Sequence, residues 1–169
     1  MTKTSVIITT YNRPDALAAV LEGFRNQNKI DFEVVIANDG STQDTADLIG
    51  HLARQMPFLV RHVWQEDKGF RAAAARNRAI AASSGDYLIF VDGDCIPFPD
   101  FITTHLGLAE SGWFVAGNRI LMNPSFTRRV LAEKLPVHSW AVLKWVNARI
   151  RGWINRLLPL LRLPDGTFR

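Results

Sequence analysis

Two aspartates flanking one glycine, Asp92-Gly93-Asp94, are the most chemically distinctive group in this sequence of 169 residues. They directly follow the apolar run 87–91, whose composition predicts a buried strand. A strand end would hold both carboxylates at the rim of a sheet, where they repel each other unless a cation lies between them. Oxygen ligands of this kind suit Mg²⁺ or Mn²⁺, which also bind diphosphates. The motif therefore predicts a divalent metal site, with an exposed acidic turn as the alternative.

Polar side chains also follow two other predicted strands. The run 5–10 carries Thr9 and leads into Tyr11, whose ring can stack on a planar base. The run 32–37 leads into Asp39, whose carboxylate can accept hydrogen bonds from a base or a ribose hydroxyl. The alternatives are an aromatic residue at a domain rim and a turn former that caps the next helix. Three strand ends of this kind would converge on one crevice.

A group of basic residues surrounds the start of a predicted helix over residues 69–84: Lys68, Arg71, Arg76 and Arg78. The amino end of a helix together with an arginine is a natural diphosphate site. We expect Arg71 to fill this role because it lies in the first turn. The alternative is a solvated basic helix face.

The order of the predicted elements indicates the fold class. Strands alternate with helices, and each strand is a continuous apolar run, as in a parallel sheet that helices cover on both faces. The sequence therefore predicts an α/β protein with a mostly parallel, Rossmann-like sheet. Gly85 is expected to end the alanine-rich helix in a left-handed conformation. The predicted strands are 5–10, 32–37, 59–63, 87–91 and one near 113–116, with a helix near 99–110 before the last of them.

Several functional classes lack their motif. No glycine-rich dinucleotide fingerprint follows the first strand, and neither a phosphate-binding P-loop nor a G-x-S-x-G nucleophile motif is present. The four histidines are scattered without metal-ligand spacing, which argues against a zinc site. Residues 1–127 carry 11 Lys and Arg against 14 Asp and Glu, whereas 128–169 carry nine against two. Because the excess of positive charge is confined to the tail, we do not expect a nucleic-acid partner.

The ordered segments SVIITTYNRP, EVVIANDGST and KGFRAAAARNRAIAASSGDYLIFVDGDC resemble the family 2 glycosyltransferases with the GT-A fold. The resemblance covers about residues 4–120. It implies an inverting transfer from a nucleotide-diphospho-sugar donor, often UDP-linked, with Mn²⁺ or Mg²⁺ bound. Thr9 and Tyr11 would line the nucleoside pocket, Asp39 would hold the base, and Arg71 would lie near the diphosphate. Asp92 and Asp94 match the family's D-x-D motif, which contacts ribose and metal.

One part of the family pattern is missing from this sequence. The resemblance implies a carboxylate beyond the D-x-D motif, in an acceptor-binding half, that acts as general base. The acidic residues after Asp94 form no Glu-Asp pair, and Asp165 is only a weak candidate for the base. We therefore expect a truncated chain with its donor-binding half intact. The alternative to a working enzyme is a catalytically inactive nucleotide-binding module.

The predicted domains are 1–123, which would bind the nucleotide-sugar, and a basic, helical segment 124–169. Residues 144–163 mix Trp, Leu, Ile and Arg, so they would either lie on an anionic membrane surface or begin an acceptor-binding part. Contact with a membrane would suit a glycan or lipid-linked acceptor of cell-envelope polysaccharide or lipopolysaccharide synthesis. The single cysteine, Cys95, fits a reducing compartment. We therefore expect a cytoplasmic protein, which would lie at the inner face of the membrane if residues 144–163 contact a bilayer.

Overall fold

The computed structural model describes residues 3–160, and the chain divides into two compact units, Met1–Val115 and Ala116–Arg169. Residues 116–123, which the sequence assigned to the first domain, group with the second unit. An antiparallel bridge between Met122 and Ile154 holds this stretch there. None of the helices within residues 3–160 has the length and apolar character needed to cross a membrane.

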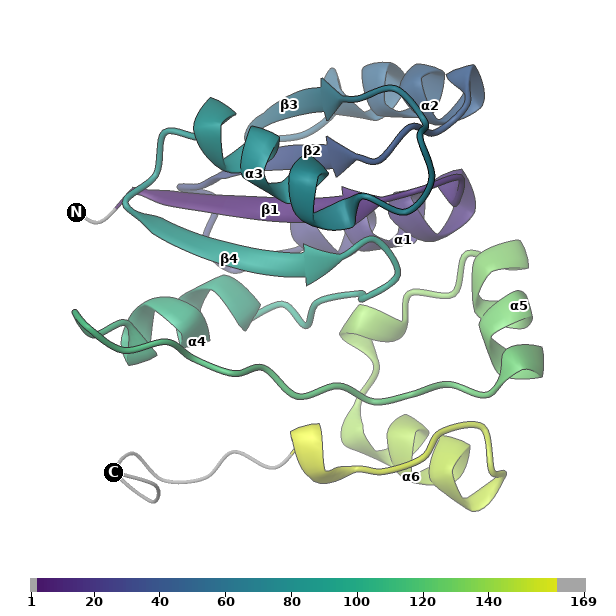
Figure 1. Cartoon of the computed structure of the whole chain (residues 1–169). Coiled ribbons are helices and arrows are strands. Elements are labelled where there is room, and N and C mark those ends of the chain that lie inside the picture. Colours follow the sequence, from purple (N-terminus) through teal and green to yellow (C-terminus); the bar gives the residue numbers. More distant parts are fainter. Residues whose placement is uncertain (1–2, 161–169) are drawn as a thin grey trace. The chain divides into compact units, whose positions relative to one another are not determined.

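The first unit is built on four parallel strands in the order β3-β2-β1-β4 (Figure 1). The two central strands are apolar and buried, as their β-branched composition requires, whereas β3 and β4 form the edges. The predicted parallel α/β sheet is therefore confirmed. The strands are β1 (Thr4–Thr10), β2 (Glu33–Asn38), β3 (Leu59–Trp64) and β4 (Tyr87–Asp92).

Helices cover both faces of this sheet, because successive side chains of a strand point to opposite sides. Val6 and Ile8 of β1 pack in the larger core with α1, α2 and α4, while Ile7 packs in a smaller core with Ala75 and Ala79 of α3. Figure 1 shows α3 on one side of the sheet and α1 and α2 on the other. The helices are α1 (Pro14–Arg25), α2 (Gln43–Ala53), α3 (Ala72–Ala82) and α4 (Phe101–Leu108).

The strand order places the carboxyl end of β1 at the centre of the sheet edge. The chain adds β2 and β3 on one side of β1 and then crosses to add β4 on the other side. Thr10 is consequently paired with Asn38, and Thr9 is paired with Asp92. In open α/β sheets, such a switch of direction leaves a crevice where ligands bind.

Two local predictions are wrong. Residues 113–116 form no strand, and among the described residues they have no neighbouring strand to pair with; the side chains of Trp113 and Phe114 are exposed. Gly85 does not adopt a left-handed conformation. The last residue of α3 is Ala82, and Ser83, which follows it, already has an extended backbone conformation. Glycine is needed at position 85 for another reason: a Cβ there would lie 2.6 Å from the backbone nitrogen of Ser5.

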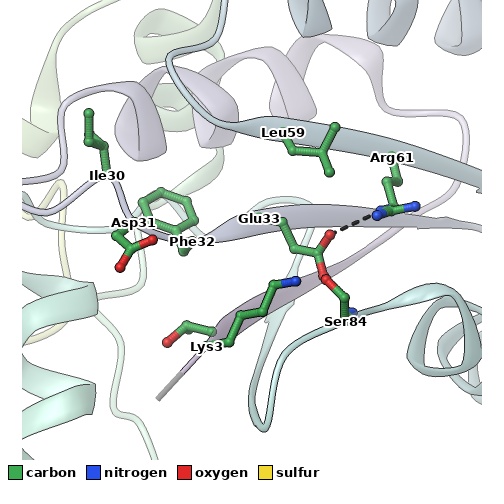
Figure 2. Close-up of a pocket in the computed structure, with 9 residues that line it drawn as sticks. Lys3, Ile30, Asp31, Phe32, Glu33, Leu59, Arg61 and Ser84 are labelled. Atoms are coloured by element: carbon green, nitrogen blue, oxygen red, sulfur yellow. Dashed lines mark hydrogen bonds and ion pairs between the residues drawn. The ribbon is translucent and has the colours of Figure 1, made fainter. Parts of the chain in front are cut away.

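A buried carboxylate ties the amino ends of the strands together. Oε1 of Glu33 accepts hydrogen bonds from the Ser5 hydroxyl at 2.7 Å and from the backbone N–H and hydroxyl of Ser84 at 2.6 and 2.7 Å. Oε2 accepts one from Nε of Arg61 at 3.0 Å. Glu33, Arg61 and Ser84 line a pocket at the amino ends of the strands (Figure 2). Its volume is about 210 Å³, and it lies at the opposite end of the strands from Asp39 and Asp92. Because protein donors already occupy the carboxylate, we assign the pocket a structural role.

The second unit is a small helical assembly around aromatic side chains. The side chain of Asn123 caps α5 by accepting a hydrogen bond from the Phe126 N–H at 2.8 Å. Phe126 stacks on Trp153, and Trp145 is buried with Ala148. The described part of the expected basic segment, residues 124–160, is therefore largely helical, as predicted. Its elements are α5 (Pro124–Ala132), η1 (Val137–Ser139), α6 (Val142–Ile150) and η2 (Leu158–Leu160).

Candidate functional site

A tight turn at the end of β4 carries the two aspartates. The N–H of Gly93 donates to the carbonyl of Thr9 at 2.8 Å, and the N–H of Cys95 donates to the carbonyl of Asp92 at 3.0 Å. A Cβ at Gly93 would lie 2.7 Å from the Thr9 carbonyl oxygen, so only glycine lets the turn lie this close to β1. Both carboxylates are exposed. The turn thus presents Asp92 and Asp94 to solvent from a fixed backbone.

Arg76 of α3 connects this turn to β1. Its Nη2 donates to Oδ1 of Asp92 at 3.0 Å, and its Nε donates to the hydroxyl of Thr9 at 2.8 Å. The guanidinium thereby fixes the orientation of the first aspartate of the motif. It also adds a positive charge beside the two carboxylates, where an anionic ligand would bind.

Tyr11 lies beyond the end of β1 with about half of its surface exposed. Its hydroxyl donates to Oδ2 of Asp67 at 2.9 Å. This hydrogen bond, together with the charge of Asp67, raises the pKa of the Tyr11 hydroxyl above its ordinary value. The hydrogen bond holds the hydroxyl end of the side chain while the ring stays accessible, so the ring is suitable for stacking on a base.

Asp39 is almost fully buried, and it joins three elements. Its backbone N–H donates to the carbonyl of Thr10 at 3.0 Å. Oδ1 accepts from Nε2 of Gln65 at 2.6 Å, and Oδ2 accepts from the backbone N–H of Arg71 at 2.8 Å. Protein donors therefore reach both oxygens, and each oxygen keeps a second lone pair for a ligand. The alternative is a cap of the next helix, α2, but that helix has Thr42 at its N-cap position, and Asp39 accepts instead from the Arg71 N–H at the start of α3.

Arg71 occupies the N-cap position of α3, near the first turn where we expected it. Its Nη2 donates to the backbone carbonyl of Glu66, while its Nε is buried without a partner among the described residues. The side chain thus points toward the loop after β3. A role at a diphosphate would require this guanidinium to exchange the carbonyl of Glu66 for a phosphate oxygen.

The donor set at the turn fits a divalent cation. Carboxylate oxygens of Asp92 and Asp94 and the sulfur of Cys95 all lie within 4.8 Å of one another. Hard oxygen donors next to an open, solvent-facing side are the environment in which Mg²⁺ or Mn²⁺ keeps water or phosphate ligands. The fit rests on the chemistry of this set.

The sheet brings the six predicted site residues into two adjoining groups. Thr9, Asp92 and Asp94 lie with Arg76 on one side of the β1 end. On the other side, Tyr11, Asp39 and Arg71 lie with two residues that the sequence reasoning missed, Asp67 and Gln65. Asp165, the weak candidate for the base, lies outside the described residues.

Comparisons with known proteins identify the family. The sequence model of glycosyl transferase family 2 matches residues 5–160. This chain belongs to glycosyl transferase family 2. The relatives of this glycosyltransferase include the hyaluronan synthase of Pasteurella multocida, which is 34% identical over 103 residues, 60% of this chain. The chain spans 10% of the length of that synthase.

Solved structures place the sheet of this glycosyltransferase in the GT-A fold. The mannosyltransferase PcManGT from Pyrobaculum calidifontis, in complex with GDP-Man and Mn²⁺, matches with a TM-score of 0.59 and 22% identity over 76% of this chain and 38% of its own. S. aureus TarS 1-349, in complex with UDP-GlcNAc, matches with a TM-score of 0.55 and 22% identity over 68% of this chain and 37% of its own. At these identities the likeness concerns the fold.

Proposed function

We propose that this chain binds a nucleotide-diphospho-sugar, with a UDP-sugar as the first choice, and serves its transfer with inversion to a glycan or lipid-linked acceptor. The observation that carries the proposal is that three polar strand ends lie side by side at the carboxyl edge of the sheet. Family membership supports the reaction class, and the UDP-GlcNAc and GDP-Man complexes of the two solved structures support the donor class. Cell-envelope polysaccharide or lipopolysaccharide synthesis would supply such an acceptor.

The two groups of side chains would bind different parts of the nucleotide-diphospho-sugar. Tyr11 stacks on the base, and Asp39 accepts a hydrogen bond from it with the oxygen lone pairs that Gln65 and Arg71 leave open. Thr9 lines the nucleoside pocket beside Arg76. Arg71 approaches the diphosphate from the start of α3. This arrangement orients the sugar toward the Asp92–Asp94 turn.

Asp92 and Asp94 would hold Mn²⁺ or Mg²⁺ against the diphosphate. When bound, the ion supplies positive charge that stabilises the leaving nucleotide diphosphate. Arg76 contributes a second positive charge at the same place through its contact with Asp92. The Mn²⁺ in the mannosyltransferase structure supports an ion in this fold.

Calorimetric titration of the chain with UDP, GDP and dTDP, each with and without Mn²⁺, tests the proposal. We expect UDP to bind more tightly with Mn²⁺ than without it, because Asp92 and Asp94 would hold the ion and its charge would attract the diphosphate. Absence of binding by all three nucleotides under both conditions would exclude the proposed donor site. Sugar transfer or donor hydrolysis by the same chain would exclude the alternative of an inactive nucleotide-binding module.

We further propose that the basic segment contacts the membrane, which would place the protein at the cytoplasmic face. Trp145 cannot contribute to such a contact, because it is buried within the second unit. The apolar side chains that α6 does expose are Val142, Leu143 and Ile150, and Lys144 and Arg149 flank them. Apolar side chains among cations suit the surface of an anionic bilayer.

Cosedimentation with lipid vesicles checks the membrane proposal. We expect the chain to bind vesicles of phosphatidylcholine mixed with phosphatidylglycerol but not vesicles of phosphatidylcholine alone. Replacing Leu143 and Ile150 together by Ser should weaken binding at least about tenfold, since both side chains would leave the bilayer. Leu108→Ser, at an exposed leucine of the first unit, is the matched control. Equal binding of all three proteins would refute a contact through α6.

A further inference from the structure

The turn that carries Asp92 and Asp94 also carries the only cysteine of the sequence, Cys95. We propose that the sulfur of Cys95 is a third protein ligand of the divalent ion, so that the site favours thiophilic ions over Mg²⁺. This inference rests on the metal site of the proposed function and adds to it a residue that sets metal preference.

The distances between the donor atoms carry the first step. Metal–oxygen bonds of about 2.1 Å and a metal–sulfur bond of about 2.3 Å place the ligands of one ion about 3 Å apart when adjacent and about 4.4 Å apart when opposite. Here the Cys95 thiol donates a hydrogen bond to Oδ1 of Asp94 with 3.6 Å between sulfur and oxygen, and all three donor atoms lie within 4.8 Å of one another. Binding of the sulfur to an ion would release the thiol proton to solvent. Small rotations of the side chains therefore suffice for all three to reach one ion.

The backbone keeps these donors together. The hydrogen bond from the Cys95 N–H to the Asp92 carbonyl closes the turn, and the bond from the Gly93 N–H to Thr9 fixes the turn to β1. Cys95 is partly exposed, so an ion that enters from solvent can reach its sulfur. The hydrogen bond from Arg76 to Asp92 fixes the orientation of the first carboxylate. The three donors are thus arranged before an ion binds.

The donor chemistry then predicts selectivity. Mg²⁺ prefers an octahedron of oxygen ligands, whereas sulfur donors favour softer ions such as Zn²⁺ and Co²⁺. With two carboxylates and one sulfur, Co²⁺ gains from the third ligand and Mg²⁺ does not. Replacing Cys95 by Ser removes the soft donor and keeps a side chain of similar size, while Cys95→Asp makes an all-oxygen site.

Titration of the full chain with Co²⁺, followed by near-ultraviolet absorption, tests the inference without an activity assay. We expect wild type to develop a sulfur-to-cobalt charge-transfer band. Cys95→Ser should lack this band and bind Co²⁺ at least about tenfold more weakly, or about 1.4 kcal/mol. Its Mg²⁺ affinity should stay within about twofold of wild type, and Cys95→Asp should bind Mg²⁺ more tightly than wild type does.

The outcomes separate this inference from the function on which it rests. Binding of Co²⁺ by wild type without the band, and equally tightly by Cys95→Ser, would overturn the role of Cys95 and leave the metal site standing. A band that survives in Asp94→Asn would also overturn it, because the sulfur would then bind an ion elsewhere. If wild type binds none of Co²⁺, Mn²⁺ and Mg²⁺, with or without UDP, both the inference and the proposed metal site fail.

Discussion

Asp94→Asn should lose metal-dependent nucleotide binding, with the affinity for UDP in the presence of Mn²⁺ falling at least about 100-fold. Asp94 is exposed at the tip of the turn, and no salt bridge involving it is found among residues 3–160. An amide in its place removes one negative ligand without disturbing the backbone hydrogen bonds of the turn. Calorimetric titration with UDP and Mn²⁺ measures the loss, and circular dichroism checks that the variant is folded.

Asp100→Asn is the matched control for this experiment. Asp100 lies at the start of α4, six positions along the chain from Asp94 and outside the group of metal donors. We expect the UDP affinity of this variant to stay within about twofold of wild type, because Asp100 is not one of the metal donors. A twofold change in affinity corresponds to about 0.4 kcal/mol of binding free energy. Equal losses in the two variants would show that the metal does not bind at the Asp92–Asp94 turn.

Glu33→Gln should lower the free energy of unfolding by about 3 kcal/mol at neutral pH. Burial alone would raise the pKa of Glu33, but hydrogen bonds from Ser84, Ser5 and Arg61 outweigh it and lower the pKa from 4.5 to about 2. The amide of glutamine keeps the size of the side chain, yet its NH₂ group cannot accept from these donors. Chemical denaturation followed by circular dichroism measures the difference.

The pH dependence of the same difference provides a second measurement. Because the pKa of Glu33 is lower in the folded protein than in the unfolded chain, its stabilisation is fully present above about pH 4.5. The stabilisation is then lost as the pH falls from about 4.5 toward 2, where the folded protein also takes up the proton. We expect the stability of wild type to approach that of Glu33→Gln across this window.

Glu22→Gln is the control for the stability experiment. Glu22 pairs with Arg25 on the exposed side of α1, and nearly half of its side chain is accessible. Surface pairs of this kind contribute about 0–1 kcal/mol, so this variant should differ little from wild type. A difference between wild type and Glu33→Gln that stays constant from pH 7 to 2.5 would contradict a role for the charge of Glu33.

The sheet could be predicted from the sequence because its central strands satisfy local and tertiary preferences at once. The middles of β1 and β2 are β-branched, apolar and buried, so their composition and their environment agree. Residues 113–116 have the same apolar character, but a strand also needs a hydrogen-bonding partner, which composition does not encode. Gly85 was assigned correctly as a special position but for the wrong reason, since the contact with Ser5 joins residues 80 positions apart.

The candidate site was predictable where residues follow strands directly, and less so where a helix supplies the side chain. Asp39 follows β2 and Asp92 ends β4, and these two strands lie on either side of β1, so both residues lie at the same edge of the sheet. Arg76 was not singled out, since four basic residues surround the start of α3 and spacing alone does not orient them. A signal was nevertheless present: Arg76 lies four residues after Ala72 and three before Ala79, on the edge of the buried alanine stripe.

The pairing of β1 with β4 has a consequence for how the protein reaches its working state. Thr9 and Asp92 are neighbours in the sheet but are 83 positions apart in the chain, so their contact closes one of the longest loops of the first unit. Contacts of such sequence separation form late, after local helices and the nearer β1–β2 pair have reduced the entropy that remains to be lost. During synthesis, we therefore expect one edge of β1 to lack a hydrogen-bonding partner strand until β4 has been made. Thr9 and Asp92 come together only with this last pairing, so binding of the proposed nucleotide would report the completion of folding.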